Sequence, residues 1–169
     1  MPESILVRYG AMGEVGRFVA ANGRTESETA VATAVVVRTA RGEELGTVIG
    51  SAGTVDSVDD ASPCVLRVAT DEDQTTLARH RADCEREFPA WQNRIRDWQV
   101  DLELIDLERT LDGQRLILYV LNDRGPETTK LALRAAAAGF GVIEVQPVGP
   151  EGLIPTASGG GGCGNCGRK

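Results

Sequence analysis

The stretch LERTLDGQRLILYVL, residues 107–121, decides how the second half of the chain folds. Its centre is Asp112-Gly113, a dipeptide that strongly favours a tight hairpin turn between two strands. The residues after the turn, RLILYVL, are apolar at successive positions, so this strand is expected to be central and covered on both sides. The sequence therefore predicts a hairpin formed by residues 102–110 and 114–121.

A long helix is expected before this hairpin, from residue 71 to about residue 99. Thr70 can cap its first amides, and Asp73, three residues on, completes a capping box. The acidic run 71–73 complements the positive end of the helix dipole. Pro89 lies inside the helical pattern and has no N–H to donate. We therefore expect a kink or a break into two helices near residues 85–88.

One face of this predicted helix carries an apolar stripe that only Arg81 interrupts. The stripe either covers the sheet of its own domain or faces a partner helix, and core packing is the favoured interpretation. Its members are Leu77, Cys84, Phe88, Trp91, Ile95 and Trp98.

Short β-type runs separated by glycines fill the first fifty residues, which is typical of a small twisted barrel or sandwich. The acidic, small-residue stretch 50–63 that follows reads as a linker. After the hairpin, a helix is expected from Pro126 to Gly139, followed by a strand over residues 141–148.

Together these patterns predict an α+β protein in three parts. Residues 1–63 form a small β-barrel-like subdomain with its linker. Residues 64–149 form an α+β subdomain with a long helix, the hairpin, a second helix and a strand. Residues 150–169 form a flexible tail rich in glycine and cysteine, because so few apolar side chains cannot offset the entropy of ordering it.

Composition excludes several classes of protein. With 18 basic and 25 acidic residues the net charge is −7, which disfavours nonspecific binding to nucleic acid. No signal-peptide pattern and no run of 18 apolar residues occurs, so we expect a cytoplasmic protein that does not enter a membrane. The sequence has a single histidine and lacks both the nucleophile-elbow and the phosphate-loop motifs. We therefore expect no enzyme and no small-molecule substrate.

Cys163 and Cys166 have the spacing that lets two thiolates reach one metal ion. A zinc site or an iron-sulfur cluster usually needs four ligands, so this pair is half a site. His80 and Cys84 share a helical face and would complete a Cys3His set if the tail folded back. The alternatives are a buried, inert Cys84 and a solubilising tail with reactive thiols.

Arginines on the long helix, Arg94 and Arg96 among them, alternate with acidic residues. This pattern is usual for a solvated face with ion pairs one turn apart. The sharper alternative is an RNA-binding stripe in which aromatic side chains stack on bases. The stacking candidates are Phe18, Trp91, Trp98 and Tyr119.

Three stretches in this order resemble the PSP-one C-terminal domain family: GEELGTV at 42–48, RVATDED at 67–73 and the hairpin segment at 107–121. The resemblance covers about residues 5–149. It implies a regulatory protein like the bacterial members, which control cell fate and sporulation. Those members join two small helical proteins in a complex and share iron-sulfur clusters with them. The complex promotes mRNA maturation by ribonuclease Y. The chain departs from the family pattern in LNDRGPE, residues 121–127, although it keeps Arg124.

The resemblance thus implies a non-catalytic cytoplasmic regulatory adaptor linked to RNA processing and mRNA maturation. Other protein subunits are its expected partners, and they would dock on barrel loops and on the helical surface. Arg94, Arg96 and Arg124 are the residues expected on a partner or RNA surface. The alternative is a metal- or iron-sulfur-dependent RNA-binding module, with Cys163 and Cys166 as ligands of a cluster or of zinc.

Overall fold

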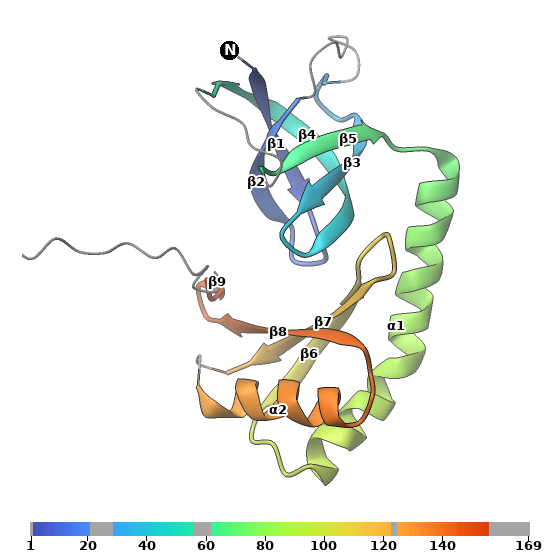
Figure 1. Ribbon diagram of the computed structural model, residues 1–169, viewed down its shortest axis with the longest axis vertical. Helices are drawn as coiled ribbons and strands as arrows, with labels where there is room; N and C mark the ends of the chain where they lie inside the picture. The colour runs from blue at the N-terminus through green and yellow to red at the C-terminus, as the bar shows by residue number, and fades with distance from the viewer. Residues whose placement is uncertain (1, 21–28, 56–61, 123–124, 156–169) are drawn as a thin grey trace, which may run out of the picture.

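The computed structural model describes residues 2–20, 29–55, 62–122 and 125–155, and this part contains two sheets and two helices (Figure 1). The expected mixture of helices and strands is confirmed, with strands predominating. The strands are β1 (Glu3–Tyr9), β2 (Glu14–Val19), β3 (Ala34–Thr39), β4 (Gly42–Thr54), β5 (Cys64–Val68), β6 (Glu103–Arg109), β7 (Arg115–Leu121), β8 (Val142–Gly149) and β9 (Gly152–Leu153). The helices are α1 (Asp71–Asp97) and α2 (Pro126–Ala137), and neither is long and apolar enough to cross a membrane.

The first five strands form a closed barrel in the order β1-β2-β5-β3-β4. Valines from several strands fill it, because alternate residues of a strand point to one face and β-branched side chains pack well there. Gly46 lets β4 lie close to β1, since a Cβ at this position would be only 2.5 Å from Cγ1 of Val7. The packed interior consists of Ile5, Val7, Phe18, Val35, Val37, Val48 and Val65.

The second sheet has the order β6-β7-β8-β9, with β7 antiparallel to β6 and parallel to β8. Every residue from Leu116 to Val120 is buried, as expected for a strand covered on both faces. One face of the sheet packs on α1 and α2, and Tyr119 on the other face reaches the barrel. Figure 1 shows this layering, with the barrel above the sheet and α2 below it.

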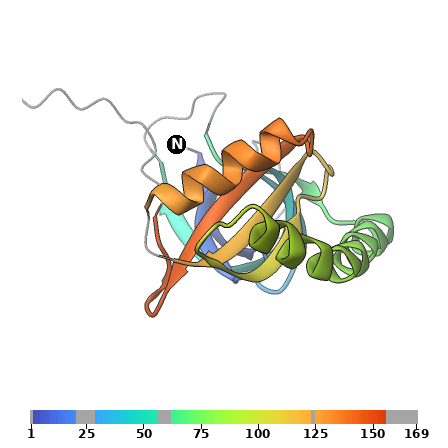
Figure 2. The same ribbon diagram turned by 90° about the horizontal axis from the view of Figure 1, so that it is seen from below.

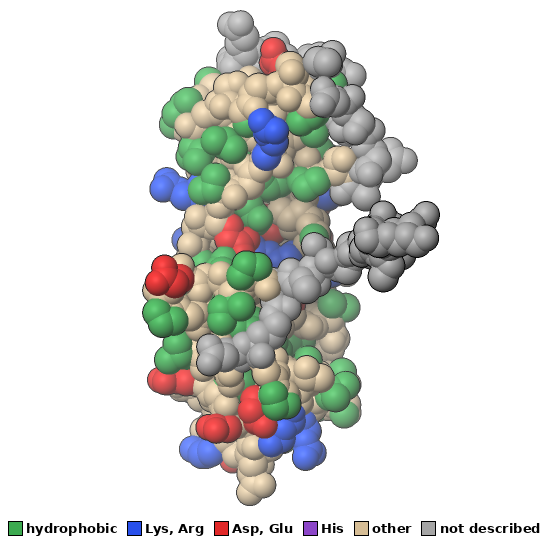
Figure 3. All heavy atoms as spheres, turned by 90° about the vertical axis from the view of Figure 1, so that its left-hand side faces the viewer, with side chains coloured by type: hydrophobic (Ala, Val, Ile, Leu, Met, Phe, Trp, Pro, Cys, Tyr) green, Lys and Arg blue, Asp and Glu red, His purple; other side chains and the backbone are tan. Residues whose placement is uncertain are grey.

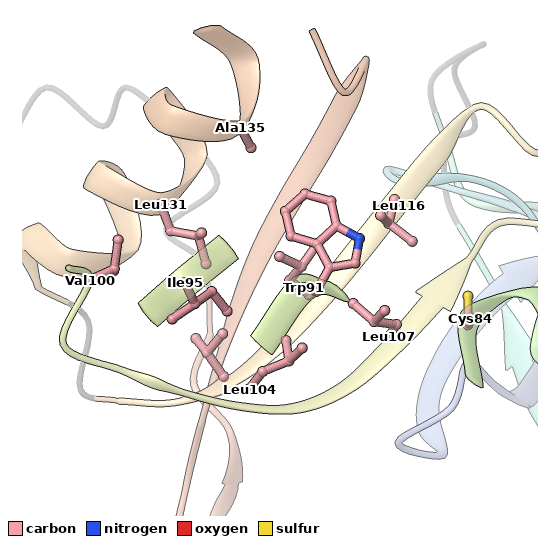
Figure 4. Packing of buried hydrophobic residues seen from close by; sticks show 11 residues of the cluster. Cys84, Trp91, Ile95, Val100, Leu104, Leu107, Leu116, Leu131 and Ala135 are labelled. Carbon is pink, nitrogen blue, oxygen red and sulfur yellow. The ribbon is translucent and has the colours of Figure 1, made fainter. Parts of the chain in front are cut away.

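The core beneath the sheet surrounds Trp91, whose side chain is 1% exposed (Figure 4). The favoured interpretation of the apolar stripe, core packing, is confirmed for Cys84, Trp91 and Ile95, which are buried there. The buried cluster consists of Cys84, Trp91, Ile95, Val100, Leu104, Leu107, Leu116, Leu118, Val120, Leu131 and Ala135.

Helix α1 is one continuous helix of 27 residues that runs past Pro89. The expected break into two helices is therefore wrong, although Figure 2 shows the axis changing direction along its course. Pro89 and Glu85 both lie on the exposed side of the helix. Pro89 has no N–H to donate to the carbonyl of Glu85, and on this side of the helix the carbonyl can hydrogen-bond to water instead. The proline therefore destabilises the helix less here than it would on the side that faces the core.

The capping box predicted at the start of α1 is present. Oγ1 of Thr70 accepts a hydrogen bond from the N–H of Asp73 at 3.3 Å, and Oδ2 of Asp73 accepts one from the N–H of Thr70 at 2.8 Å. Arg67 of β5 also pairs with the Asp73 carboxylate. The hydrogen bond from Arg67, followed by those from Thr70, holds the pKa of Asp73 well below its usual range.

Replacing Asp73 with alanine is expected to lower the free energy of unfolding by about 1 kcal/mol at neutral pH, the usual loss for a helix cap. The Arg67 pair adds little because that side chain is 48% exposed. Since the pKa of Asp73 is depressed in the folded state, this contribution is present above the unfolded value of 3.8 and is lost as pH falls through the folded value. Urea unfolding at neutral pH and near pH 2 measures both effects, and an equal deficit at both would contradict them.

The proposed division after residue 63 separates β5 from its hydrogen-bond partners. β5 pairs with β3 and with β2 in the barrel, so residues 64–68 complete the first sheet before the chain enters α1. Strand order along the sequence gave no sign of this, because the partners of β5 lie far away in the chain. In the expected tail, β9 adds to β8 at Val148, and residues 156–169 lie outside the described part.

Candidate functional site at the junction of barrel and sheet

The turn between β3 and β4 fits against the β6–β7 hairpin. The N–H of Leu111 donates to the carbonyl of Glu43 at 2.8 Å, and the N–H of Glu43 donates to Oδ2 of Asp112 at 3.2 Å. Nη1 of Arg115 donates to the carbonyl of Ala40 at 3.3 Å. These three contacts, one between backbone groups and two with a side chain on one side, fix the hairpin to the barrel and define the junction between the two halves.

Arg41 lies at the centre of this junction and is 9% exposed. Its Nε and Nη2 donate to the two carboxylate oxygens of Glu44 at 3.2 and 2.5 Å, the paired geometry that suits a guanidinium. Its Nη1 donates to the hydroxyl of Tyr119 on β7 at 3.0 Å. The side chain thus joins a barrel carboxylate to the central strand of the second sheet.

Two more carboxylates surround the same guanidinium. Oε2 of Glu14 is 3.4 Å and Oε2 of Glu108 is 4.0 Å from Nη2 of Arg41. The hydroxyl of Tyr119 donates to Glu108 at 2.5 Å, and the N–H of Ala11 donates to the same carboxylate at 2.8 Å. Burial is the largest influence on Glu108 and raises its pKa, although Tyr119 and Arg41 act in the opposite direction.

We call these five side chains the junction cluster: Arg41, Glu14, Glu44, Glu108 and Tyr119. Three carboxylates share one buried guanidinium, so removing the guanidinium would leave negative charges without compensation. Figure 3 shows acidic and basic side chains gathered at the level where the barrel meets the sheet, on the face away from α1.

Beside the junction cluster, a cavity of about 560 Å³ opens between α1, β6 and the barrel. Its size is within the range of binding pockets for ligands. We call it the junction groove. Its walls are Leu77, His80, Arg81, Cys84, Glu85 and Phe88 of α1, Ile105–Arg109 of β6, and Ala11.

The structure brings His80 and Cys84 to the same wall of the groove, one helical turn apart, as the sequence predicted. Burial, with Arg109 and Arg79 nearby, lowers the pKa of His80, and its Nδ1 is buried with no hydrogen-bond partner in the described part of the chain. Burial raises the pKa of the Cys84 thiol to about 11, which makes it a poor ligand in this state.

The expected metal ligands Cys163 and Cys166 lie outside the described residues. Among residues 2–20, 29–55, 62–122 and 125–155, no three His, Cys, Asp or Glu side chains are grouped so that they could hold a metal ion. The four-ligand site that would combine Cys163 and Cys166 with His80 and Cys84 therefore stays a prediction.

Cys84 is expected to resist alkylation by iodoacetamide at pH 8 in the folded protein, whereas half-buried Cys64 reacts. A rise of about two pKa units lowers the thiolate fraction about a hundredfold, and burial blocks access as well. Peptide mass spectrometry after timed labelling measures both cysteines, with denatured protein as the control. Equal labelling of Cys84 in folded and denatured protein would mean that the groove opens to solvent.

The arginines expected on a partner or RNA surface have different surroundings. The guanidinium of Arg94 lies over the rings of Trp91, at 5.0 Å, and Phe140, at 4.4 Å, so it is part of an aromatic cluster. Arg96 is exposed, with Nε 3.5 Å from Oδ1 of Asp97. Arg124 lies outside the described residues.

Three of the four aromatic side chains considered for base stacking are buried. Phe18, Trp91 and Tyr119 are 1%, 1% and 0% exposed, so stacking by them is wrong. Trp98 is half-buried and packs against Trp91 in a T-shaped arrangement at a centroid distance of 6.3 Å. Sequence reasoning missed the junction cluster, for which one signal existed: Tyr119 has the only hydroxyl in an apolar strand, and a buried hydroxyl needs a partner.

Residues 63–125 match the family model for the PSP1 C-terminal conserved region. This segment is a PSP1 C-terminal region. The resemblance noted in the sequence is thereby confirmed. The PSP1 region runs from β5 through α1 and β6 to β7, so it supplies every wall residue of the junction groove except Ala11.

A curated relative of this PSP1-containing chain is the stage 0 sporulation protein YaaT of Bacillus subtilis strain 168. The two are 29% identical over 136 residues, which cover 79% of this chain and 48% of the relative. The chain thus spans about half the length of that relative. No solved structure matches the chain significantly.

Proposed function

We propose that this protein is a non-catalytic regulatory adaptor that docks partner proteins of an RNA-processing machine in its junction groove. The observation that carries the proposal is the position of the PSP1 region. The segment that matches the family is the one that builds the walls of the groove, in α1 and β6. A function shared by the family would act through this surface.

The chemistry of the groove supports a protein partner over RNA. Basic Arg81 and Arg109 are set among acidic Glu85, Asp106 and Glu108, and the whole chain carries a net charge of −7. A phosphate backbone is held by an excess of positive charge, which these residues do not provide. A mixed, partly apolar groove is typical of protein recognition.

The relative supports a regulatory role in particular. YaaT is a sporulation protein by its name, and the similarity covers most of this chain. The proposed link to mRNA maturation rests on the resemblance of the sequence to the PSP-one family, and the partners are the other subunits of such a complex.

Affinity purification of the tagged full chain from its native cells tests the proposal. We expect a stoichiometric protein partner that survives nuclease treatment. The paired change Arg81→Glu and Glu85→Lys in the groove should abolish its capture, whereas Arg134→Glu on the exposed face of α2 should not. Nucleic acid that accounts for the bound mass, seen as a high ratio of absorbance at 260 and 280 nm, would favour the RNA-binding alternative instead.

The possible ligands in the tail need a separate test, because an adaptor can act with or without a metal. Metal and sulfide analysis of anaerobically purified protein, compared with the Cys163→Ser, Cys166→Ser double variant, provides it. Stoichiometric iron and sulfide, or zinc, that disappears in the variant would support the predicted site. Metal-free wild-type protein would overturn it.

A further inference from the structure

Strand β6 is an edge strand, since it pairs with β7 on one side only within the described part of the sheet. The N–H of Thr110 donates to the carbonyl of Arg115 at 3.1 Å, which fixes the phase of the ladder. In an antiparallel pair alternate residues bond across the ladder. Residues 108 and 110 therefore face β7, and Leu107 and Arg109 turn their backbone groups outward, toward the junction groove.

This outward row of backbone groups already has local partners at two places. The N–H of Leu107 donates to the carboxylate of the preceding residue, Asp106, at 2.8 Å. Two residues beyond Arg109, the N–H of Leu111 donates to a barrel carbonyl, that of Glu43, at 2.8 Å. Charged side chains on an edge strand are a usual protection against unwanted strand pairing. At Leu111 the outward edge is thus already paired with the backbone of the barrel. At Leu107 it is covered only by the Asp106 carboxylate, which an added strand could displace.

The dimensions of the groove fit an extended segment. The wall residues 105–109 of β6 span about 17 Å at about 3.3 Å per residue. The facing wall residues 77–88 of α1 span about 18 Å at about 1.5 Å per residue. Apolar side chains are available on both walls, with Leu77 and Phe88 half-buried on α1 and Ile105 40% exposed on β6.

The charges of the groove indicate what such a segment carries. Arg109 is paired with Glu87 at 3.5 Å, and Glu108 belongs to the junction cluster. The remaining charged wall residues are Glu85, Asp106 and Arg81, an excess of one acidic group. A segment with a lysine or arginine complements this wall better than an acidic one does.

We propose that the junction groove binds an extended, basic segment of a partner protein that adds as a strand to the free edge of β6. The segment's backbone pairs with Leu107 and Arg109 and displaces the Asp106 carboxylate from the amide. Its alternate apolar side chains contact Phe88 and Ile105. Its basic side chain pairs with the displaced carboxylate of Asp106 or with that of Glu85 in the facing wall. The inference rests on the proposed adaptor function and specifies how its partner is recognised.

Selection from a random library of short peptides displayed on phage, with the full chain as the target, tests the proposal. We expect enriched peptides with apolar residues at every second position and at least one lysine or arginine. Ile105→Lys should weaken their binding at least about tenfold, because a lysine on an edge strand blocks pairing. Val142→Lys, a change at a residue that is 58% exposed on β8, is the matched control. Thermal unfolding verifies that both variants are folded.

Backbone pairing has its own readout. Two peptides are compared, each methylated at one of the two alternating sets of backbone nitrogens. Methylation of the set that faces β6 should weaken binding about tenfold for each hydrogen bond lost, and methylation of the other set should leave binding unchanged. The amides of Leu107 and Arg109 should become protected from hydrogen exchange. Binding that is unchanged by both methylation patterns would overturn strand addition. So would enriched peptides whose apolar residues recur every three or four positions, as in a helix, or the absence of any peptide whose binding is weakened by Ile105→Lys.

The failure of this inference is distinguishable from failure of the adaptor function. A partner that is lost in the Arg81→Glu, Glu85→Lys variant but retained by Ile105→Lys would keep the adaptor proposal and overturn strand addition. A partner retained by both variants would overturn both.

Discussion

Replacing Trp91 with alanine is expected to lower the free energy of unfolding by about 3–5 kcal/mol, the range for removing a large buried aromatic side chain. The indole is 1% exposed and lies among residues of α1, β6, β7 and α2 (Figure 4). The change would also remove the ring beneath Arg94 and the contact with Phe140, whose centroid lies 4.8 Å away. A domain of this size is stabilised by about 5–15 kcal/mol, so the loss is a large fraction of the total.

Urea unfolding monitored by circular dichroism measures this effect, with Leu133→Ala as the control. Leu133 is 65% exposed on α2, so its truncation should change the free energy by less than about 0.5 kcal/mol. Similar losses in both variants would show that the cluster beneath the sheet is not the main core of this half.

Replacing Arg41 with methionine is expected to cost about 3–5 kcal/mol at neutral pH, the range for breaking a buried ion pair by removing one partner. Methionine keeps much of the volume but leaves Glu44 and Glu108 without the guanidinium. Arg134→Met, at an exposed position near the end of α2, is the matched control and should be close to neutral. A second change, Glu44→Gln, should recover part of the loss, because it removes one of the uncompensated charges.

The Arg41→Met deficit should shrink as pH falls from neutral toward 4.5, the ordinary pKa of a glutamate side chain. The folded-state pKa of Glu108 lies above the ordinary value of 4.5, so its protonated form is favoured by folding, and stability declines as pH rises through the folded value. Arg41 is one of the groups that lower this pKa, so its removal extends the decline to higher pH. Urea unfolding across this pH range measures the trend. A deficit that is constant with pH would mean that the carboxylates are solvated once Arg41 is gone.

Local patterns predicted the elements of this fold that depend on neighbouring residues. The capping box at Thr70 needs only residues three positions apart, and the Asp112-Gly113 turn needs only the two strands that it joins. The burial of β7 followed from its apolar run. In each case the physical cause lies within a few residues, so the sequence shows it directly.

Features that depend on distant partners could not be predicted in this way. Asp112 was expected only to form a turn, yet its carboxylate also accepts the amide of Glu43, 69 residues away. Arg41 lies next to a glycine in a polar turn, which is typical of an exposed residue, and it is buried because Tyr119 and Glu108 meet it from another sheet. The candidate groove has the same origin, since its walls come together only when the barrel, α1 and β6 have packed.

The barrel is closed where β2 meets β5, and this contact has a mechanical consequence. The two strands are parallel there and are bridged at the single pair Val19 and Cys64, whereas β5 lies along β3 over four pairs. Because β5 leads directly into α1, a force on the helix is transmitted along the β3 ladder and is resisted least at the β2 contact. A displacement of α1 would therefore separate β5 from β2 before it separates β5 from β3. The helix and β5 would then move together, with the pairing to β3 as the axis of the movement.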